Sequence, residues 1–249
     1  MILTVDIGNT TIALGVMRKG KALRLERVET VTPLRLLRVL RVFKNSGYAF
    51  DVAVICSVVP EVTVIVERII RKYTNIEVKV VGRDIVVPIK NCYKNPRQVG
   101  QDRLVGAYAA LHLYGKPAIV IDLGTAITFD AVSGKGEYWG GVIVPGLRLS
   151  AESLFLKTAL LPEIALKAPK GVIGKTTEQS ILSGLFYGYG SLCRGMIELM
   201  GRQMRMKPKV VMTGGHTRLM KKFIAPQIRS IDDHLVHKGM ALLVGKPNL

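Results

Sequence analysis

The sequence has no long apolar run, few cysteines and comparatively few acidic residues. No stretch reaches the roughly 18 uninterrupted apolar residues of a membrane-spanning helix, so we expect no membrane partner. No basic segment precedes Asp6 at the amino terminus, which argues against a secretory signal. The three cysteines, Cys56, Cys92 and Cys193, are widely spaced and predict neither a disulfide framework nor a zinc site. These absences favour a cytoplasmic protein.

Acidic residues are outnumbered two to one, since 18 Asp and Glu face 36 Lys and Arg and leave a net charge of +18. A charge of this size is compatible with nucleic-acid binding or with a solvated basic surface. The basic residues are spread along the chain, as in 35–44 and 202–209, without an aromatic-rich RNA motif, zinc finger or long basic tail. We therefore favour the basic surface and expect no specific nucleic-acid partner.

Several catalytic signatures are also absent. The sequence contains no Walker A loop, no G-x-G-x-x-G and no G-x-S-x-G segment. Its four histidines show no metal-ligand spacing. His234 and His237 share a helix face without a third ligand, and we expect them to be a solvated pair. The sequence therefore predicts neither a P-loop nor a histidine metal site.

Apolar residues make up 49% of the 249 residues, enough for a sizeable core. In the first half their pattern predicts the order β-β-β-α-β-α-β, a mixed sheet covered by helices. The continuous apolar run of residues 52–58 indicates a buried strand, and apolar residues at helical spacing after Pro33 indicate a helix. The predicted strands are 2–6, 11–17, 22–28, 52–58 and 78–81, and the predicted helices begin near Pro33 and Pro60.

A second series of predicted strands and helices begins after Pro117. Four glycines in the predicted helix 176–200 are costly in a helix interior, so either helices pack very closely there or the chain breaks. Both halves begin with two apolar strands joined by an Asp-x-Gly turn. We therefore expect two copies of one unit, residues 1–115 and 116–249, with a nucleotide cleft between them. The other elements predicted here are strands 118–122, 127–132, 138–144 and 210–212, and helices at about 149–158 and 234–244.

Each half contains an Asp-x-Gly turn. Residues 6–12 (DIGNTTI) match residues 122–128 (DLGTAIT), and each segment joins the end of one apolar strand to the next. Small residues in such a turn let backbone N–H groups approach a phosphate. Asp6 would repel phosphate directly, so it would act through Mg²⁺ or its bound water. The first turn alone could equally be a Gly-Asn hairpin, but the second copy, with Gly124 and Thr125, favours phosphate binding.

Two further motifs are individually weak. Asp102 lies at the start of a predicted helix, where an acid commonly caps the helix or complements its dipole, and the residues alone favour that structural role. Arg103 beside it could bind a carboxylate or a phosphate. The pair Gly214-Gly215 would let adenine and ribose lie against the backbone, or it is simply a strand-to-helix turn.

In their order, these motifs are similar to those of the type III pantothenate kinases, members of the superfamily of actin-like sugar kinases and heat-shock ATPases. The resemblance runs from end to end of the chain. It implies an α/β, duplicated actin-like (ribonuclease H-like) fold, with two mixed-sheet halves and helices around a central nucleotide cleft. The matching segments are 6–10, 100–104, 122–126, 136–141, 145–146, 161–162, 174–177, 183–184 and 213–215.

The resemblance implies ATP-dependent phosphorylation of pantothenate to 4'-phosphopantothenate, the first step of coenzyme A biosynthesis. Asp102 matches the proton acceptor of the family, and Asp122 matches the ligand of its monovalent cation, K⁺ or NH₄⁺. ATP, with Mg²⁺, would be held by Asp6, Ile7, Gly8, Asn9, Thr10, Thr11, Ile12 and Ala13 in the first half and by Thr125 in the second. Pantothenate would contact Tyr93, Gly100, Gln101, Asp102, Arg103 and Thr177. The resemblance also implies a homodimer with the substrate site near the subunit interface.

Three residues depart from the family pattern. Gln101 stands where Ala is usual, and its bulk could narrow the acceptor pocket. Thr176 stands where Asn is usual. His216, after the double glycine, is also unusual and could alter the adenine edge of the site.

Two other functions stay open from the sequence. One is an actin-like kinase for another small hydroxyl acceptor. The other is a transcriptional accessory factor of the same family, which the charge of +18 invites. The presence of all the acidic residues assigned to catalysis and ion binding argues against a purely non-catalytic role.

Overall fold

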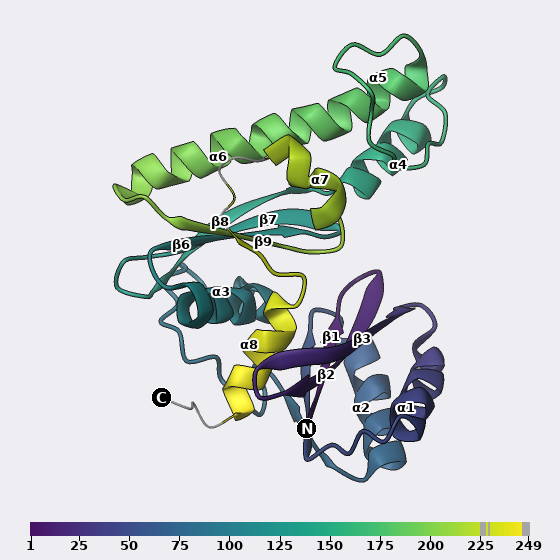
Figure 1. The fold of residues 1–249 in the computed structure, drawn as a ribbon, viewed down its shortest axis with the longest axis vertical. Coiled ribbons are helices and arrows are strands. Elements are labelled where there is room, and N and C mark those ends of the chain that lie inside the picture. Colours follow the sequence, from purple (N-terminus) through teal and green to yellow (C-terminus); the bar gives the residue numbers. More distant parts are fainter. Residues whose placement is uncertain (225–227, 229, 246–249) are drawn as a thin grey trace. The chain divides into compact units, whose positions relative to one another are not determined.

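The computed structural model describes residues 1–224, 228 and 230–245. The chain divides into two compact units, each built around a five-stranded sheet (Figure 1). The first unit contains residues 1–113 and the segment from His234 onward, and the second unit contains residues 114–233. Within the described ranges, no helix is both long enough and apolar enough to cross a bilayer.

The sheet of the first unit has the strand order β3-β2-β1-β4-β5. Its first three strands form an antiparallel meander, β4 runs parallel to β1, and β5 runs parallel to β4. The apolar runs of β1, β2 and β4 are buried, as expected for strands covered on both faces. The strands are β1 (Ile2–Ile7), β2 (Thr11–Arg18), β3 (Lys21–Glu29), β4 (Val52–Ser57) and β5 (Glu77–Val80).

Helices cover both faces of this sheet. On one face, α1 and α2 bury Phe43 and Val66 together with Val5 of β1. On the other face, α8 reaches Thr4 of β1, whose side chain points opposite to that of Val5. The helical elements of the unit are η1 (Pro33–Arg35), α1 (Leu36–Asn45), α2 (Pro60–Thr74), η2 (Pro96–Gln98), α3 (Gln101–Tyr114) and α8 (Leu235–Val244).

The second unit repeats the arrangement. Its sheet has the order β10-β9-β6-β7-β8, with β6 to β8 antiparallel, β9 parallel to β6 and β10 parallel to β9. Thus β6 corresponds to β1, and Asp122 and Asp6 occupy the same place near the end of their strands. The duplicated fold predicted from the two Asp-x-Gly turns is confirmed. The strands are β6 (Ala118–Leu123), β7 (Ala126–Val132), β8 (Tyr138–Pro145), β9 (Lys209–Thr213) and β10 (Ser230–Ile231).

The predicted helix 176–200 is continuous in the second unit, with a change of winding in the middle. It passes from α5 through the π-helical segment η3 into α6, so the glycines do not break the chain. Gly190 is needed for packing, because a Cβ there would lie 2.5 Å from the carbonyl oxygen of Phe223. The helices of the unit are α4 (Leu147–Lys157), α5 (Thr177–Ser183), η3 (Gly184–Gly188), α6 (Tyr189–Met204) and α7 (Thr217–Ile224).

Three features differ from the sequence-based expectation. Helix α7 and the two-residue strand β10 were not predicted. The boundary 1–115/116–249 places the last helix in the second half, whereas α8 packs with the first unit. The reason is close packing: a Cβ on Gly239 of α8 would lie 2.7 Å from Val105 of α3, and one on Gly15 of β2 would lie 2.9 Å from the ring of His237.

Candidate functional site

The first candidate residue, Asp6, lies near the end of β1 and pairs in register with Cys56 of β4. The turn that follows is closed by a hydrogen bond from the Gly8 amide to the Thr11 carbonyl, 3.0 Å long. The Thr30 hydroxyl also donates to the Gly8 carbonyl, at 2.8 Å. The turn is therefore a hairpin connection held by a threonine from beyond β3, a contribution that the local sequence did not indicate.

The residues of this turn differ in what they can offer a ligand. Asn9 and Thr10 are exposed, whereas Gly8 and Thr11 are half-buried. The side chains of Ile7 and Ile12 pack in the core under α1 and α2 and Ala13 is also buried, so only backbone atoms of these three could reach a nucleotide. The exposed part of the predicted ATP-binding segment is its tip.

Asp102 is the second residue of α3, a first-turn acid rather than the residue before the helix. Its Oδ1 accepts a hydrogen bond of 2.8 Å from the Arg103 amide. The carboxylate lies over the Cα of Gly100, where any Cβ would meet Oδ1. Burial raises the pKa of Asp102, and the bond from Arg103 opposes the shift only in part. A half-buried carboxylate with a raised pKa has the properties of a general base.

Cys56 was not identified as a functional residue from the sequence, yet its surroundings connect two of the predicted ones. The thiol is fully buried on β4, and burial together with the charges of Asp6 and Asp102 raises its pKa. It therefore stays neutral and adds no negative charge beside the two carboxylates. Asp6 and Asp102 thus both lie near enough to Cys56 for their charges to act on its thiol.

The remaining acceptor residues of the first unit surround the start of α3. Gln101 and Arg103 flank Asp102 and are half-buried. Tyr93 is also half-buried, and its amide donates to the Asn91 side chain at 3.0 Å, which fixes the loop before η2. Gly100 has no space for a side chain, as described above.

In the second unit, Asp122 occupies a cradle formed by two glycines. An ideal Cβ on Gly214 would meet its Oδ1, and one on Gly124 would lie 3.5 Å from the same oxygen. Gly214 has a φ of +100°, a conformation that glycine adopts without strain. Gly124 and Gly214 thus give room to the carboxylate, while Thr125 is exposed in the turn next to it.

His216 lies directly after this glycine pair. Its amide donates to the Leu123 carbonyl at 3.1 Å, which ties the start of α7 to the end of β6. Burial, and then the charge of Arg148, lower its pKa, so the imidazole is neutral near pH 7. Its Nδ1 is buried without a hydrogen-bond partner among the described atoms.

Thr177, the acceptor residue predicted in the second unit, is exposed at the first position of α5. The N-cap is Thr176, whose Oγ1 accepts from the Gln179 amide at 3.2 Å. The Gln179 side chain in turn accepts from the Lys175 amide at 2.9 Å. Thr176 therefore serves as a helix cap, a role that Asn performs equally well.

The acidic residues fit the ions expected from the sequence. No group of three or more His, Cys, Asp or Glu side chains suited to a metal occurs in the described part of the chain. Mg²⁺ does not require one, since it commonly binds through one or two carboxylates and the substrate phosphates while keeping several waters. The strand-end carboxylate of Asp6 fits that pattern, and the cradled carboxylate of Asp122 offers an oxygen ligand of the type that hard cations prefer.

Comparison with known proteins settles the family. A model of the type III pantothenate kinase family matches residues 2–199. The chain belongs to the type III pantothenate kinase family. A type III pantothenate kinase from Persephonella marina is 44% identical over 230 residues, which cover 89% of this chain and 90% of that protein. Membership makes the chain an enzyme, a kinase that transfers phosphate from ATP.

Solved structures support the fold. A Campylobacter jejuni protein assigned to the Baf family of transcriptional activators superposes with a TM-score of 0.64 at 16% identity, covering 97% of this chain and 96% of its own. The activator of 2-hydroxyisocaproyl-CoA dehydratase from Clostridium difficile, solved with bound ADPNP, reaches 0.54 at 12% identity, with 96% and 92% covered. At these identities the likeness concerns the actin-like fold alone.

Proposed function

We propose that this protein phosphorylates the hydroxyl group of pantothenate with ATP, the first step of coenzyme A biosynthesis, with Asp102 as the proton acceptor. The observation that carries the proposal is the position of the Asp102 carboxylate, which lies against Gly100 at the start of α3 with a raised pKa, in a chain of the type III pantothenate kinase family. A carboxylate with a raised pKa is a stronger base than an exposed one.

The role of Asp102 follows from its hydrogen bonds. Oδ1 is fixed by the Arg103 amide, which leaves Oδ2 to accept the hydrogen of the pantothenate hydroxyl. Phosphoryl transfer has a loose transition state, so the enzyme contributes chiefly by positioning the acceptor and neutralising charge. Asp102 therefore orients the hydroxyl oxygen and takes its proton late in the reaction. Tyr93, Gly100, Gln101, Arg103 and Thr177 complete the proposed acceptor site.

The phosphates of ATP are assigned to the turn after Asp6 and to Thr125. Backbone N–H groups and the exposed side chains of Asn9 and Thr10 supply donors at the tip of the first turn. Asp6 would hold Mg²⁺, and Asp122 would hold a monovalent cation, K⁺ or NH₄⁺. When bound, these ions neutralise negative charge on the phosphates, as in other phosphoryl transfers.

The assembly and location are part of the same proposal. We infer a homodimer in the cytoplasm, as the family resemblance implies. Large apolar side chains on the second unit, Leu156, Leu160 and Ile173, are 72%, 91% and 88% exposed, and an assembly would bury such groups.

A coupled assay of ATP turnover tests the reaction. We expect ADP release that depends on pantothenate, is stimulated by K⁺ or NH₄⁺ and is absent with other small alcohols at the same concentration. Mass spectrometry should identify 4'-phosphopantothenate as the product. Turnover with a different hydroxyl compound but not with pantothenate would reassign the protein to another acceptor, and no turnover with any acceptor would contradict the kinase assignment.

Replacing Asp122 by Ala tests the cation. We expect Asp122→Ala to weaken K⁺ stimulation and to raise the KM for ATP, because the carboxylate in the glycine cradle is the proposed ligand. The measurement is initial velocity as a function of K⁺ and ATP. The exposed ion-pair acid Glu152→Gln on α4 is a control and should keep the wild-type response. Full K⁺ stimulation in Asp122→Ala would remove this residue from the cation site.

A further inference from the structure

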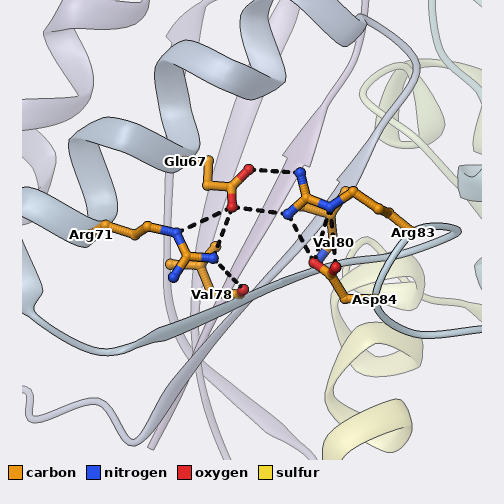
Figure 2. A network of polar contacts seen from close by, with 6 residues as sticks. All are labelled: Glu67, Arg71, Val78, Val80, Arg83 and Asp84. Atoms are coloured by element: carbon orange, nitrogen blue, oxygen red, sulfur yellow. Dashed lines mark hydrogen bonds and ion pairs between the residues drawn. The ribbon is translucent and has the colours of Figure 1, made fainter.

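A network of charged side chains lies where β5 ends (Figure 2). Glu67 of α2 accepts two hydrogen bonds from Arg83, at 2.9 and 2.8 Å, and two from Arg71, at 3.1 and 2.8 Å. The Glu67 side chain is only 15% exposed, and its bonds to Arg83, ahead of those to Arg71, lower its pKa. Arg83 also contacts Asp84 at 2.8 Å.

The network clamps a tight turn of the backbone. The Asp84 carboxylate accepts a hydrogen bond of 2.8 Å from the Val80 amide, and the Asp84 amide donates one of 2.8 Å to the Val80 carbonyl. Gly82, between the clamped residues, donates to the Ile85 carbonyl at 2.7 Å. Its φ of +85° suits glycine, and any other residue there would be strained. Arg83 and Asp84 therefore fix Gly82 relative to α2 and β5.

Gly82 is in contact with the first residue of α3. An ideal Cβ on Gly82 would lie 2.8 Å from Cδ of Gln101 and 3.0 Å from its Cγ and Nε2. The Gln101 side chain thus lies flat on the Cα of Gly82. Because Asp102 is the next residue, this contact bears on the first turn of α3, which carries the Asp102 carboxylate.

We propose that Gln101 is a positioning residue for Asp102, held in place by the turn that Glu67, Arg83 and Asp84 clamp around Gly82. The inference rests on the proposed role of Asp102 in phosphoryl transfer. The arginine partners of Glu67 are about half exposed, and ion pairs with such exposed partners usually contribute little to stability. The consequence that we assign to this network is therefore geometric: it sets where the Asp102 carboxylate meets the acceptor hydroxyl. Small displacements of a catalytic group cost large factors in rate.

A double-mutant cycle between residues 82 and 101 separates positioning from stability. Gly82→Ala should lower kcat/KM for pantothenate by about tenfold and leave the KM for ATP unchanged, because the new methyl group displaces Gln101. In a Gln101→Ala background the same Gly82→Ala change should have no further effect on kcat/KM, since the displaced side chain is gone. The backbone strain at residue 82 is the same in both backgrounds.

Gly20→Ala is the matched control. Gly20 also has a positive φ, +72°, but nothing lies within 4 Å of an added Cβ. Both this variant and Gly82→Ala should melt at a lower temperature than the wild type, but Gly20→Ala should keep wild-type kinetics. A second pair of variants tests the ion pairs of the network. Glu67→Gln should lower kcat/KM for pantothenate by about threefold. Glu26→Gln, which weakens the exposed Arg24–Glu26 pair, should leave kcat/KM unchanged.

Hydrogen exchange gives a readout that does not depend on activity. The Arg103 amide, which donates to Asp102, should exchange faster in Gly82→Ala than in the wild type or in Gly20→Ala. The positioning role is overturned if the active enzyme keeps its kcat/KM in Gly82→Ala, or if the loss persists unchanged in the Gln101→Ala background. A wild-type protein without pantothenate turnover would instead contradict the proposed function, while the exchange data would still show whether Gly82 holds the start of α3.

Discussion

Asp102→Asn is expected to lower kcat by at least about 100-fold, because general bases contribute roughly 10²–10⁴-fold, or about 3–5 kcal/mol of barrier. ATP binding and thermal stability should change little. Asn retains an Oδ1 that accepts from the Arg103 amide and fits over Gly100, so only the basic oxygen is lost. Steady-state kinetics with pantothenate, together with a thermal melt, measure both parts of the expectation.

Glu61→Gln is the matched control for this variant. Glu61 is the acid in the first turn of α2, so its charge complements a helix dipole as that of Asp102 does. If Asp102 had only a structural role, Asp102→Asn and Glu61→Gln would both have small and similar effects on kcat. Because proton transfer is late in a loose transition state, the loss in Asp102→Asn should fall at the lower end of the range. Near-normal turnover would return Asp102 to the role of a first-turn acid.

The pH profile supplies a second readout of the same residue. Asp102 must be ionised to accept a proton, and burial raises its pKa. As the pH falls through that raised pKa, kcat/KM should therefore decline at a higher pH than an exposed aspartate would allow. In Asp102→Asn, this decline of kcat/KM at low pH should be absent.

The strands were predictable because their residues are continuous apolar runs. In β1 and β6 an apolar run is followed by an aspartate, Asp6 or Asp122, near the end of the strand. The duplicated topology could therefore be predicted from these two short segments. Helix α7 was missed because it has only eight residues and its apolar positions alternate with Lys and Arg. β10 contains two residues, too few for any periodicity.

Long-range contacts account for most of what the sequence did not reveal about the site. The local pattern around Asp102 indicated either a helix N-cap or a first-turn acid, and the structure places it in the first turn. Its raised pKa depends on burial, and its neighbour Cys56 lies on a strand 46 residues earlier. The turn around Gly82 likewise depends on Glu67 from another helix. Such contacts arise only when the sheet and its helices are assembled.

Helix α8 is the clearest example, because its partner is at the other end of the chain. His237 is 4% exposed and its Nδ1 lies 2.8 Å from the Thr4 hydroxyl of β1, which also donates to the Gly15 carbonyl of β2. Burial, and then the charges of His234 and Arg27, lower the pKa of His237 to about 3. The prediction of a solvated histidine pair is therefore wrong for His237, because α8 packs against β1 and β2, a long-range contact that the helix pattern does not reveal.

The low pKa of His237 predicts a marked loss of stability in acid. An unfolded histidine binds a proton below about pH 6.5, whereas His237 in the folded chain binds one only near pH 3. Between these values the unfolded state holds the extra proton, so the free energy of unfolding falls as the pH falls, by about 1.4 kcal/mol per pH unit. The effect is roughly 4 kcal/mol at about pH 3, reaches its full size of roughly 5 kcal/mol below that, and is absent above about pH 7.

Urea unfolding of the wild type and of His237→Gln between pH 7 and pH 4 measures this contribution. Carboxylates titrate in both proteins, so the difference between the two stability curves isolates the histidine. Because Gln stays neutral, the variant should be less stable than the wild type at pH 7 but should lose stability less steeply below pH 6. His112→Gln, at an exposed histidine of α3, should keep the wild-type slope. Parallel curves for the wild type and His237→Gln would mean that the folded chain binds a proton at His237 as readily as the unfolded chain does, which would contradict the low pKa of this residue.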